Sequence, residues 1–201
     1  MRVFLIHGMG RSPWSFALLE KRLRDAGHVP SSFGYLVSRD SLDKIGKSFL
    51  AHVEAELSPG EEYAVIGHSL GGIIARHVSE KMPVGWKRFV MLAPPNRSPR
   101  AAQRLKHNAL FRALTKDAGQ KLADEKFYET LPTPKVATLV FVGTSAPSTL
   151  FHERGKIGDS VISAEEAHLE GATHVEVRSI HTFIMNNVEV ARGIIDFLKL
   201  T

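Results

Sequence analysis

The sequence contains no cysteine among its 201 residues. This absence excludes a disulfide framework, thiolate metal sites and a cysteine nucleophile. The chain also lacks any apolar run near the roughly 18–20 residues that a membrane-spanning helix needs. The apolar run at residues 3–6 is too short for a secretory signal and is followed by His7-Gly8 instead of a cleavage site. We therefore expect a cytoplasmic protein with no integral membrane segment.

Signatures of metal and nucleotide binding are absent as well. The ten histidines do not show the spacing of a zinc site. The glycine-rich turn at residues 67–72 has neither the G-x-G-x-x-G spacing nor the lysine of a phosphate-binding loop. A formal net charge of +5 is modest and favours a solvated basic surface over a nucleic-acid groove. We expect no metal, no cofactor and no nucleic-acid partner.

The composition is that of one globular domain, with 43% hydrophobic and 23% charged residues, and we treat residues 1–201 as that domain. Apolar runs predict strands at residues 3–6, 29–37, 64–66, 87–92, 136–142 and 175–180. Helical patterns lie between the strands, which favours a parallel sheet covered on both faces. We predict a three-layer α/β/α fold with about six mostly parallel strands, in which the serine-rich strand at 29–37 lies near an edge.

Residues 96–134 interrupt this alternation, because the segment holds no predicted strand. Helical spacing appears at residues 101–114, with Leu105, Leu110 and Leu114 as apolar positions, and again at 118–127. We predict a helical cap inserted in the domain. Its basic residues are Arg97, Arg100, Arg104, Lys106, Arg112 and Lys116. They either attract an anionic substrate or a phospholipid surface, or form a solvated helix face, and the sequence leaves these alternatives open.

A pentapeptide at residues 67–71, GHSLG, lies between a short apolar strand and a helical pattern. Gly67, Ser69 and Gly71 match G-x-S-x-G, the nucleophile elbow, whose strained turn projects the serine hydroxyl from the sheet edge. Glycines flank the serine because a Cβ there would collide with neighbouring backbone. The alternative is a tight glycine-rich turn without chemistry. The strand before the turn and the helix after it favour the elbow.

A serine hydroxyl needs a neighbouring base, and the base needs a carboxylate that holds its tautomer. In a parallel sheet these groups must lie beyond the carboxyl ends of the strands. His181 directly follows the last predicted strand and is the predicted base. Asp159, on the loop after the fifth strand, is the predicted acid. Glu153 is its rival in the same loop, and Asp117 and Asp124 in the insertion are weaker rivals.

Backbone N–H groups of Met9 and Leu70 are the predicted oxyanion donors. Leu70 follows the nucleophile at the start of the elbow helix, and Met9 lies in the loop after the first strand. Trp14 and His68 are candidates for the substrate-binding wall. Trp14 lies just past the oxyanion loop and is equally compatible with the core. His68 precedes the serine, and we expect its side chain to point away across the turn.

With these residues the chain resembles the α/β-hydrolase family, in its compact lipase, esterase and thioesterase-like branch. The similarity covers most of the chain and follows the family's order of serine, acid and histidine. It implies a minimal version of the fold that lacks the first two antiparallel strands of larger members. It also implies a triad with two backbone donors: Ser69, Asp159 and His181, with Met9 and Leu70.

The leading hypothesis is a serine hydrolase that cleaves a small-molecule carboxylic ester through an acyl-enzyme. Ser69 attacks, His181 shuttles the proton, and water releases the acid. An acyl thioesterase or an acyltransferase would use the same triad. A non-catalytic protein of the same fold that binds a ligand or partner is disfavoured, because a binding protein has no use for a strained serine. The acyl length, the leaving group and the oligomeric state stay open.

Overall fold

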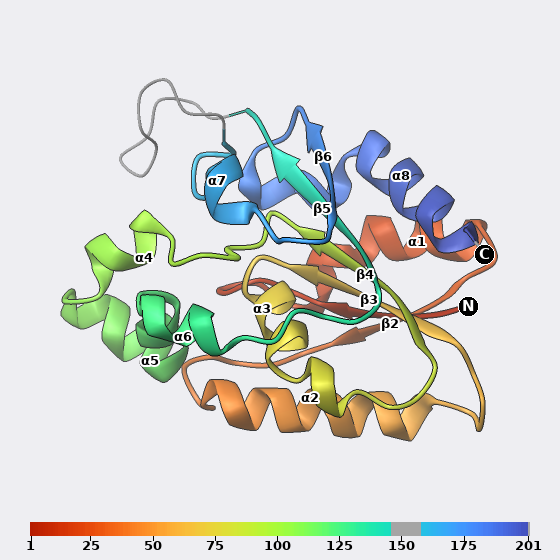
Figure 1. The fold of residues 1–201 in the computed structure, drawn as a ribbon, viewed down its shortest axis with the longest axis horizontal. Helices are drawn as coiled ribbons and strands as arrows, with labels where there is room; N and C mark the ends of the chain where they lie inside the picture. The colour runs from red at the N-terminus through yellow and green to blue at the C-terminus, as the bar shows by residue number, and fades with distance from the viewer. Residues whose placement is uncertain (146–157, 201) are drawn as a thin grey trace.

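The computed structural model describes residues 1–145 and 158–200, and its centre is a six-stranded sheet (Figure 1). The strands are β1 (Arg2–Ile6), β2 (Val29–Phe33), β3 (Tyr63–His68), β4 (Trp86–Leu92), β5 (Ala137–Gly143) and β6 (Thr173–Val177). Their spatial order is β2-β1-β3-β4-β5-β6, and every neighbouring pair is parallel. The prediction of about six mostly parallel strands is confirmed.

Burial along the strands follows their place in the sheet. All six residues of β3, in the middle, are buried, which is why this strand reads as an unbroken apolar run. β2 lies at one edge as predicted, and it carries Ser31 and Ser32 half-buried. β6 forms the other edge, with Glu176 exposed. Edge strands tolerate polar residues because one side of the strand lacks a pairing neighbour.

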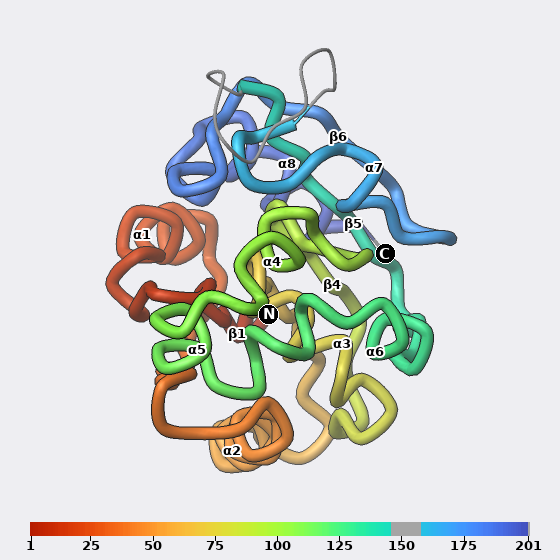
Figure 2. Tube along the Cα trace, turned by 90° about the vertical axis from the view of Figure 1, so that its left-hand side faces the viewer, coloured from red at the N-terminus to blue at the C-terminus, as the bar shows by residue number. Residues whose placement is uncertain are grey.

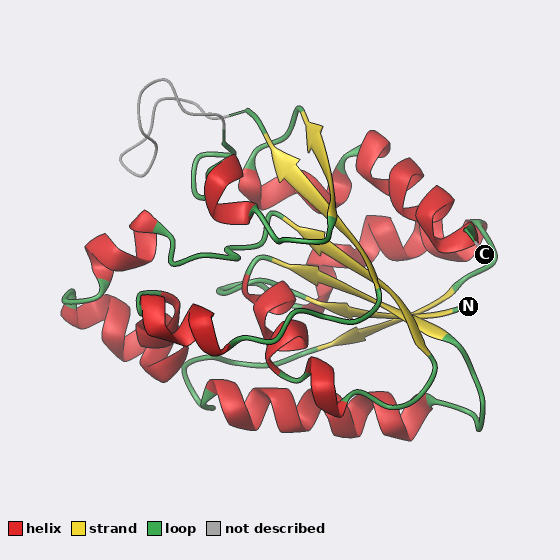
Figure 3. Ribbon diagram, viewed as in Figure 1, coloured by secondary structure: helices red, strands yellow, loops and turns green. Residues whose placement is uncertain are grey.

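Helices cover both faces of the sheet. Side chains of a strand alternate between faces, so Val3 and Leu5 pack with α1 (Ala17–Asp25) and α8 (Val188–Lys199). Phe4 and Ile6 pack on the opposite face with α2 (Leu42–Glu56) and α3 (Leu70–His77). Figures 1 and 3 show these two helix layers with the sheet between them. Each large aliphatic side chain buried this way contributes about 1.5–3 kcal/mol, so the two cores hold the strand ends in place.

Three helices stand between β4 and β5, in the interval predicted as a cap: α4 (Arg100–Leu105), α5 (Ala109–Leu122) and α6 (Glu125–Thr130). They lie beyond the carboxyl ends of the strands, and Figure 2 shows them in front of the sheet. Their role as a cap stays a prediction.

The predicted single helix at 101–114 is wrong, because it breaks before Asn108. The Asn108 side chain accepts a hydrogen bond from Phe111 N at 2.9 Å and so starts a new helix. Leu110 and Leu114, two of the apolar positions of this pattern, do not pack in the core and are 67% and 56% exposed.

Shorter helices join these elements. The 3-10 helices are η1 (Pro13–Phe16), η2 (Ser79–Lys81) and η3 (His181–Asn186), and α7 (Ala164–Ala167) is a single turn. The last strand was predicted at 175–180 but spans Thr173–Val177, because its pairing with β5 ends at the Gly143–Val177 pair. The three residues that follow it carry the chain to His181.

No helix in the described part of the chain has the length and apolar character needed to cross a membrane. Within residues 1–145 and 158–200 we also find no group of three or more histidine, aspartate or glutamate side chains that could hold a metal ion.

Candidate active site

Ser69 occupies the turn between β3 and α3. Its backbone has a φ of +50° and a ψ of −119°, a region that residues other than glycine rarely adopt. The backbone N–H of Ser69 donates to Leu92 O at 2.9 Å, which fixes the turn to the end of β4. Ser69 itself is half-buried, so part of it faces solvent. This is the conformation of a strained strand-to-helix elbow.

Glycines make the turn possible because backbone passes very close on both sides. A Cβ at Gly71 would collide with the carbonyl oxygen of Ile6. A Cβ at Gly67 would lie 2.5 Å from Gly72 Cα. Neither contact involves a flexible side chain that could move aside. The spacing of glycine around Ser69 is therefore required by packing of the turn against β1 and α3.

Asp159 and His181 are brought together by the structure. His181 Nδ1 lies 2.7 Å from Asp159 Oδ2, and the aspartate is 1% exposed. A second bond joins their backbones, since His181 N donates to Asp159 O at 3.0 Å. A carboxylate only accepts, so the imidazole carries a proton on Nδ1 and leaves the Nε2 lone pair free. This is the tautomer that a general base needs.

The carboxylate of Asp159 is anchored by its own loop. Oδ1 accepts from Val161 N at 3.0 Å and from Ile162 N at 2.8 Å. Both oxygens therefore have donors, and the buried charge is satisfied. A Cβ at Gly143 would lie 2.6 Å from Asp159 Cβ, so the end of β5 holds the aspartate in position.

The rival acids have other places. Asp117 accepts hydrogen bonds from Leu42 N at the start of α2, and Asp124 caps α6 through Lys126 N. Both are explained as helix-capping residues. Glu153 lies outside the described residues.

The residue before the serine, His68, connects the Ser69 turn to His181. Among the described residues no hydrogen bond joins Ser69 Oγ to the His181 ring. The adjacent residue makes the link, because His68 Nε2 lies 3.1 Å from His181 O and the two rings have centroids 5.0 Å apart. In free enzymes the serine–histidine contact is often long and shortens when substrate binds.

His68 is a residue whose place sequence reasoning missed. The expectation that its side chain points away from the site is wrong, because the ring is 2% exposed and packs beside His181. A Cβ at Gly8 would lie 2.7 Å from His68 Nδ1, so the missing side chain of that glycine provides the room. Burial lowers the pKa of His68 well below its usual value, and the nearby His181 adds to the effect. Its contact with substrate stays a prediction.

Candidate oxyanion donors lie on two sides of the serine. Leu70 is the first residue of α3, where a backbone N–H has no acceptor within the helix. Met9 follows Gly8, and a Cβ at Gly8 would lie 3.2 Å from Ser69 Cβ. The loop after β1 thus runs directly against the elbow. The Leu70 N–H, at a helix N-terminus, suits a developing negative charge, and the role of the Met9 N–H stays a prediction.

Trp14, the other candidate for substrate contact, is 85% exposed, whereas its neighbour Phe16 is fully buried in the core. The structure therefore places Trp14 on the surface rather than in the core, and its contact with substrate stays a prediction.

His7 holds the loop after β1 against the loop that follows β2. Its ring stacks on Tyr35 with centroids 4.3 Å apart, and Tyr35 N donates to His7 Nε2 at 3.4 Å. Tyr35 Oη donates to His7 O at 2.7 Å. Burial lowers the pKa of His7, which keeps the ring neutral and able to accept. The sequence offered no signal for this pairing beyond the His7-Gly8 dipeptide.

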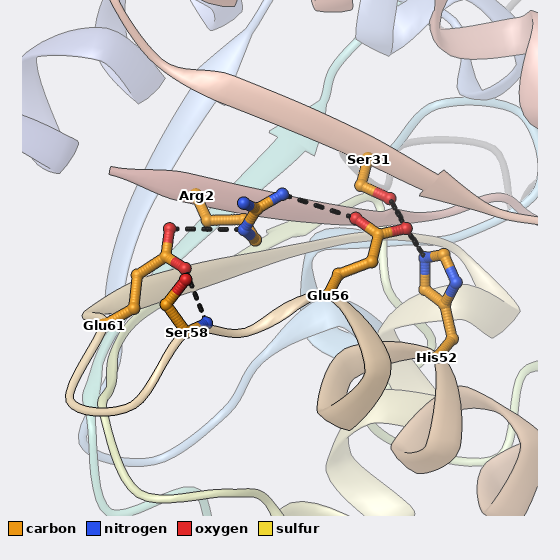
Figure 4. A network of polar contacts seen from close by, with 6 residues as sticks. All are labelled: Arg2, Ser31, His52, Glu56, Ser58 and Glu61. Atoms are coloured by element: carbon orange, nitrogen blue, oxygen red, sulfur yellow. Dashed lines mark hydrogen bonds and ion pairs between the residues drawn. The ribbon is translucent and has the colours of Figure 1, made fainter.

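A second group of serine, histidine and acid lies on β2 and α2 (Figure 4). Ser31 Oγ donates to Glu56 Oε1 at 2.8 Å and lies 3.1 Å from His52 Nε2. Glu56 also pairs with Arg2 at 3.5 Å. The full network is Arg2, Ser31, His52, Glu56, Ser58 and Glu61. Its serine is part of a regular strand, so this group has no elbow.

Two hollows lie near the carboxyl ends of the strands. One of about 600 Å³ is lined by the loop after β4 together with α4, α6 and α7. A smaller one of about 390 Å³ is lined by His7 and Arg11 from the loop after β1 and by residues 34–36, 39 and 40 after β2. Arg11 also reaches the other side of the site, because its Nη2 donates to Thr182 O at 3.4 Å.

Comparison with known proteins identifies the family of the chain. Residues 3–174 match the model of the family described as "Alpha/beta hydrolase family". The chain belongs to the alpha/beta hydrolase family. One curated relative, norfluorocurarine synthase 1 of Strychnos, is 29% identical over 92 residues. That match covers 40% of this chain and 35% of the relative, so the chain spans only about a third of that relative's length.

Lipases are among the solved structures that share this family fold. The mature lipase BlEst2 of Bacillus licheniformis aligns with a TM-score of 0.77 at 16% identity, covering 98% of this chain and 91% of that chain. The monoacylglycerol lipase of Paleococcus ferrophilus aligns with a TM-score of 0.65 at 19% identity, covering 98% of this chain and 93% of that chain. At such identities the likeness establishes the fold.

Proposed function

We propose that the protein is a carboxylic ester hydrolase with Ser69 as nucleophile, His181 as base and Asp159 as the acid that orients it. The observation that carries the proposal is the buried 2.7 Å contact between Asp159 and His181 Nδ1 at the same sheet edge as the strained Ser69 turn. Membership of the alpha/beta hydrolase family and the lipase neighbours support it.

The proposed reaction starts with proton transfer from Ser69 Oγ to His181 Nε2 as Oγ attacks the ester carbonyl. The tetrahedral oxyanion accepts hydrogen bonds from the backbone N–H groups of Met9 and Leu70. His181 then gives its proton to the leaving alcohol, and the acyl group stays on Ser69. Water, deprotonated by His181, releases the carboxylic acid and regenerates the serine.

Within this proposal the acyl acceptor and leaving group are free to vary. An acyl thioesterase cleaves a C–S bond with the same residues, and an acyltransferase replaces water with another acceptor. A panel of matched esters and thioesters with increasing acyl length separates these activities by kcat/KM.

A fluorophosphonate probe, which needs an activated serine, tests the proposal. We expect the wild type to be labelled on Ser69, as mapped by peptide mass spectrometry, and Ser69→Ala to lose the label. Ser31→Ala is the matched control and should be labelled like the wild type, since Ser31 belongs to the second group. A folded wild type that takes up no probe would favour the non-catalytic alternative, a binding protein of this fold.

A further inference from the structure

The 390 Å³ hollow beside the oxyanion loop carries two unneutralised guanidinium groups, those of Arg11 and Arg39. In the described part of the chain neither arginine lies within ion-pair distance of a carboxylate. Asp40 also lines the hollow, but its carboxylate pairs with Lys44 Nζ at 2.6 Å. The hollow therefore has a local positive excess that no carboxylate of residues 1–145 and 158–200 neutralises.

The other lining groups do not cancel this charge. His7 accepts from the backbone N–H of Tyr35 and is neutral, because its pKa is lowered by burial. The Tyr35 hydroxyl is committed to His7 O. Leu36, which is 51% exposed, adds an apolar rim. The groups left for a ligand are the two guanidinium groups and the hydroxyl of Ser12, which also lines the hollow, and all of them can donate to a carboxylate or a phosphate.

The larger 600 Å³ hollow differs in this respect. Its lining includes two arginines but four glutamates: Arg97, Arg100, Glu125, Glu129, Glu165 and Glu166. Positive charge there is balanced within the chain, so a preference for anions is not expected from it.

The 390 Å³ hollow is connected to the proposed site near Ser69 and near His181. His7, in its wall, precedes Gly8, which lies against Ser69. Arg11 donates to Thr182 O, the residue after His181. The positive charge of Arg11 also helps to lower the pKa values of His7 and His68. The wall of the hollow is thus formed by residues next in sequence to those that contact Ser69 and next to His181.

We propose that this hollow binds a carboxylate or phosphate carried by the ester substrate, through Arg11 and Arg39. The proposal rests on ester hydrolysis at Ser69 and names its substrate class: an ester with an anionic group. A guanidinium presents paired donors in one plane that match the oxygens of either anion. In this proposal the loop after β1 both donates a hydrogen bond to the oxyanion, from Met9, and binds the anionic group of the substrate, through Arg11.

Matched substrate pairs test the proposal in two arms. The carboxylate arm compares the p-nitrophenyl monoester of glutaric acid with p-nitrophenyl valerate. The phosphate arm compares the butyryl ester of glycerol 3-phosphate with monobutyrylglycerol. We expect the wild type to prefer the anionic member of at least one pair by on the order of 10–100-fold in kcat/KM at low salt. The preferred arm identifies the anion.

The double variant Arg11→Gln/Arg39→Gln should bring that ratio close to one, and Arg39→Lys should keep part of it. Lys199→Gln is the matched control. It removes one positive charge at the end of α8, near His28 and the amino terminus, where the strands begin. Its ratio should equal that of the wild type. Equal rates on both members of each pair, a ratio that survives in the double variant, or a loss in Lys199→Gln would overturn the proposal.

A binding measurement separates this proposal from the proposed function. Ser69→Ala is titrated calorimetrically with glutarate and with glycerol 3-phosphate, with and without the two arginine substitutions. Arginine-dependent binding of either anion supports the hollow even if the wild type fails to take up the fluorophosphonate probe. Hydrolysis of neutral esters together with no arginine-dependent binding would leave the proposed function intact and refute the hollow.

Discussion

The two groups of serine, histidine and acid described above differ in which atoms contact one another. In the candidate site the acid contacts His181 Nδ1 at 2.7 Å, which leaves Nε2 free for the serine. In the group on β2 and α2, Glu56 lies 3.5 Å from His52 Nε2, the same nitrogen that faces Ser31. Ser31 also donates its proton to Glu56. In the second group the acid therefore contacts the serine and the serine-facing nitrogen of His52, and it does not orient the histidine from Nδ1 as Asp159 orients His181.

Backbone and burial separate the two groups further. Ser69 sits in a turn with φ of +50° at the start of a helix, whereas Ser31 is paired within β2. Asp159 is buried and accepts only from its own loop and His181, whereas Glu56 is shared with Arg2. The order of contacts and the strained turn distinguish Ser69 from Ser31, although both groups hold the same three residue types.

The largest expected effect on kcat/KM comes from replacing the acid of each group by its amide. Asp159→Asn should lower kcat/KM for an activated ester by about 10²–10⁴-fold, because an amide also offers a donor to Nδ1 and no longer fixes the tautomer. Glu56→Gln is the matched control and should change kcat/KM by less than about twofold. Steady-state hydrolysis of p-nitrophenyl esters measures both. Equal losses in the two variants would contradict the assignment of the site.

The next largest effect is on the free energy of unfolding, and it compares a glycine beside each of the two groups. Gly71→Ala should lower the free energy of unfolding by about 3 kcal/mol or more, because its Cβ meets backbone of β1 that cannot move aside. Gly60→Ala, in the loop between Ser58 and Glu61, has open space but a φ of +75°, so about 1–2 kcal/mol is expected. Urea unfolding measures both. A Gly71→Ala protein as stable as Gly60→Ala would show that the elbow packs loosely.

A third test uses pH and the histidine beside the base. The pKa of His68 is lowered in the folded state, so below about pH 6.5 the unfolded chain takes up a proton that the folded protein does not. The free energy of unfolding should therefore fall as pH falls from 7.5 to 5.5, with about 1 kcal/mol of that loss due to His68.

His68→Gln keeps an N–H donor for His181 O and lacks the titrating group. Its loss of stability over the same pH range should be smaller by that amount, as measured by urea unfolding at the two pH values. An identical pH dependence in wild type and variant would show that His68 is not the group responsible.

The smallest expected effect concerns the second network itself. Arg2→Gln removes the ion pairs with Glu56 and Glu61, which are partly exposed, at 3.5 and 3.2 Å. The midpoint of thermal unfolding should fall by less than about 4 °C, and kcat/KM should stay within about twofold. Calorimetry and ester hydrolysis check the two values. A large loss of activity would mean that the two groups are coupled across the sheet.

The sheet, the position of its serine-rich edge and the elbow could be predicted from the amino-acid sequence. Apolar runs alternating with helical patterns leave few arrangements other than parallel strands between helix layers, and the glycines at 67 and 71 mark a turn that only close backbone packing requires. Asp159 and His181 could also be predicted to lie close together, because residues that follow parallel strands meet at one edge of the sheet.

The positions of the residues around this pair could not be predicted from the sequence and follow from the three-dimensional packing of the loops. The burial of His68 beside His181, the stacking of His7 on Tyr35 and the hollow between Arg11 and Arg39 join loops that lie 28 or more residues apart. Contacts of this kind depend on side-chain direction and on gaps such as the missing Cβ of Gly8. Local periodicity carries no information about them, because it describes one element at a time.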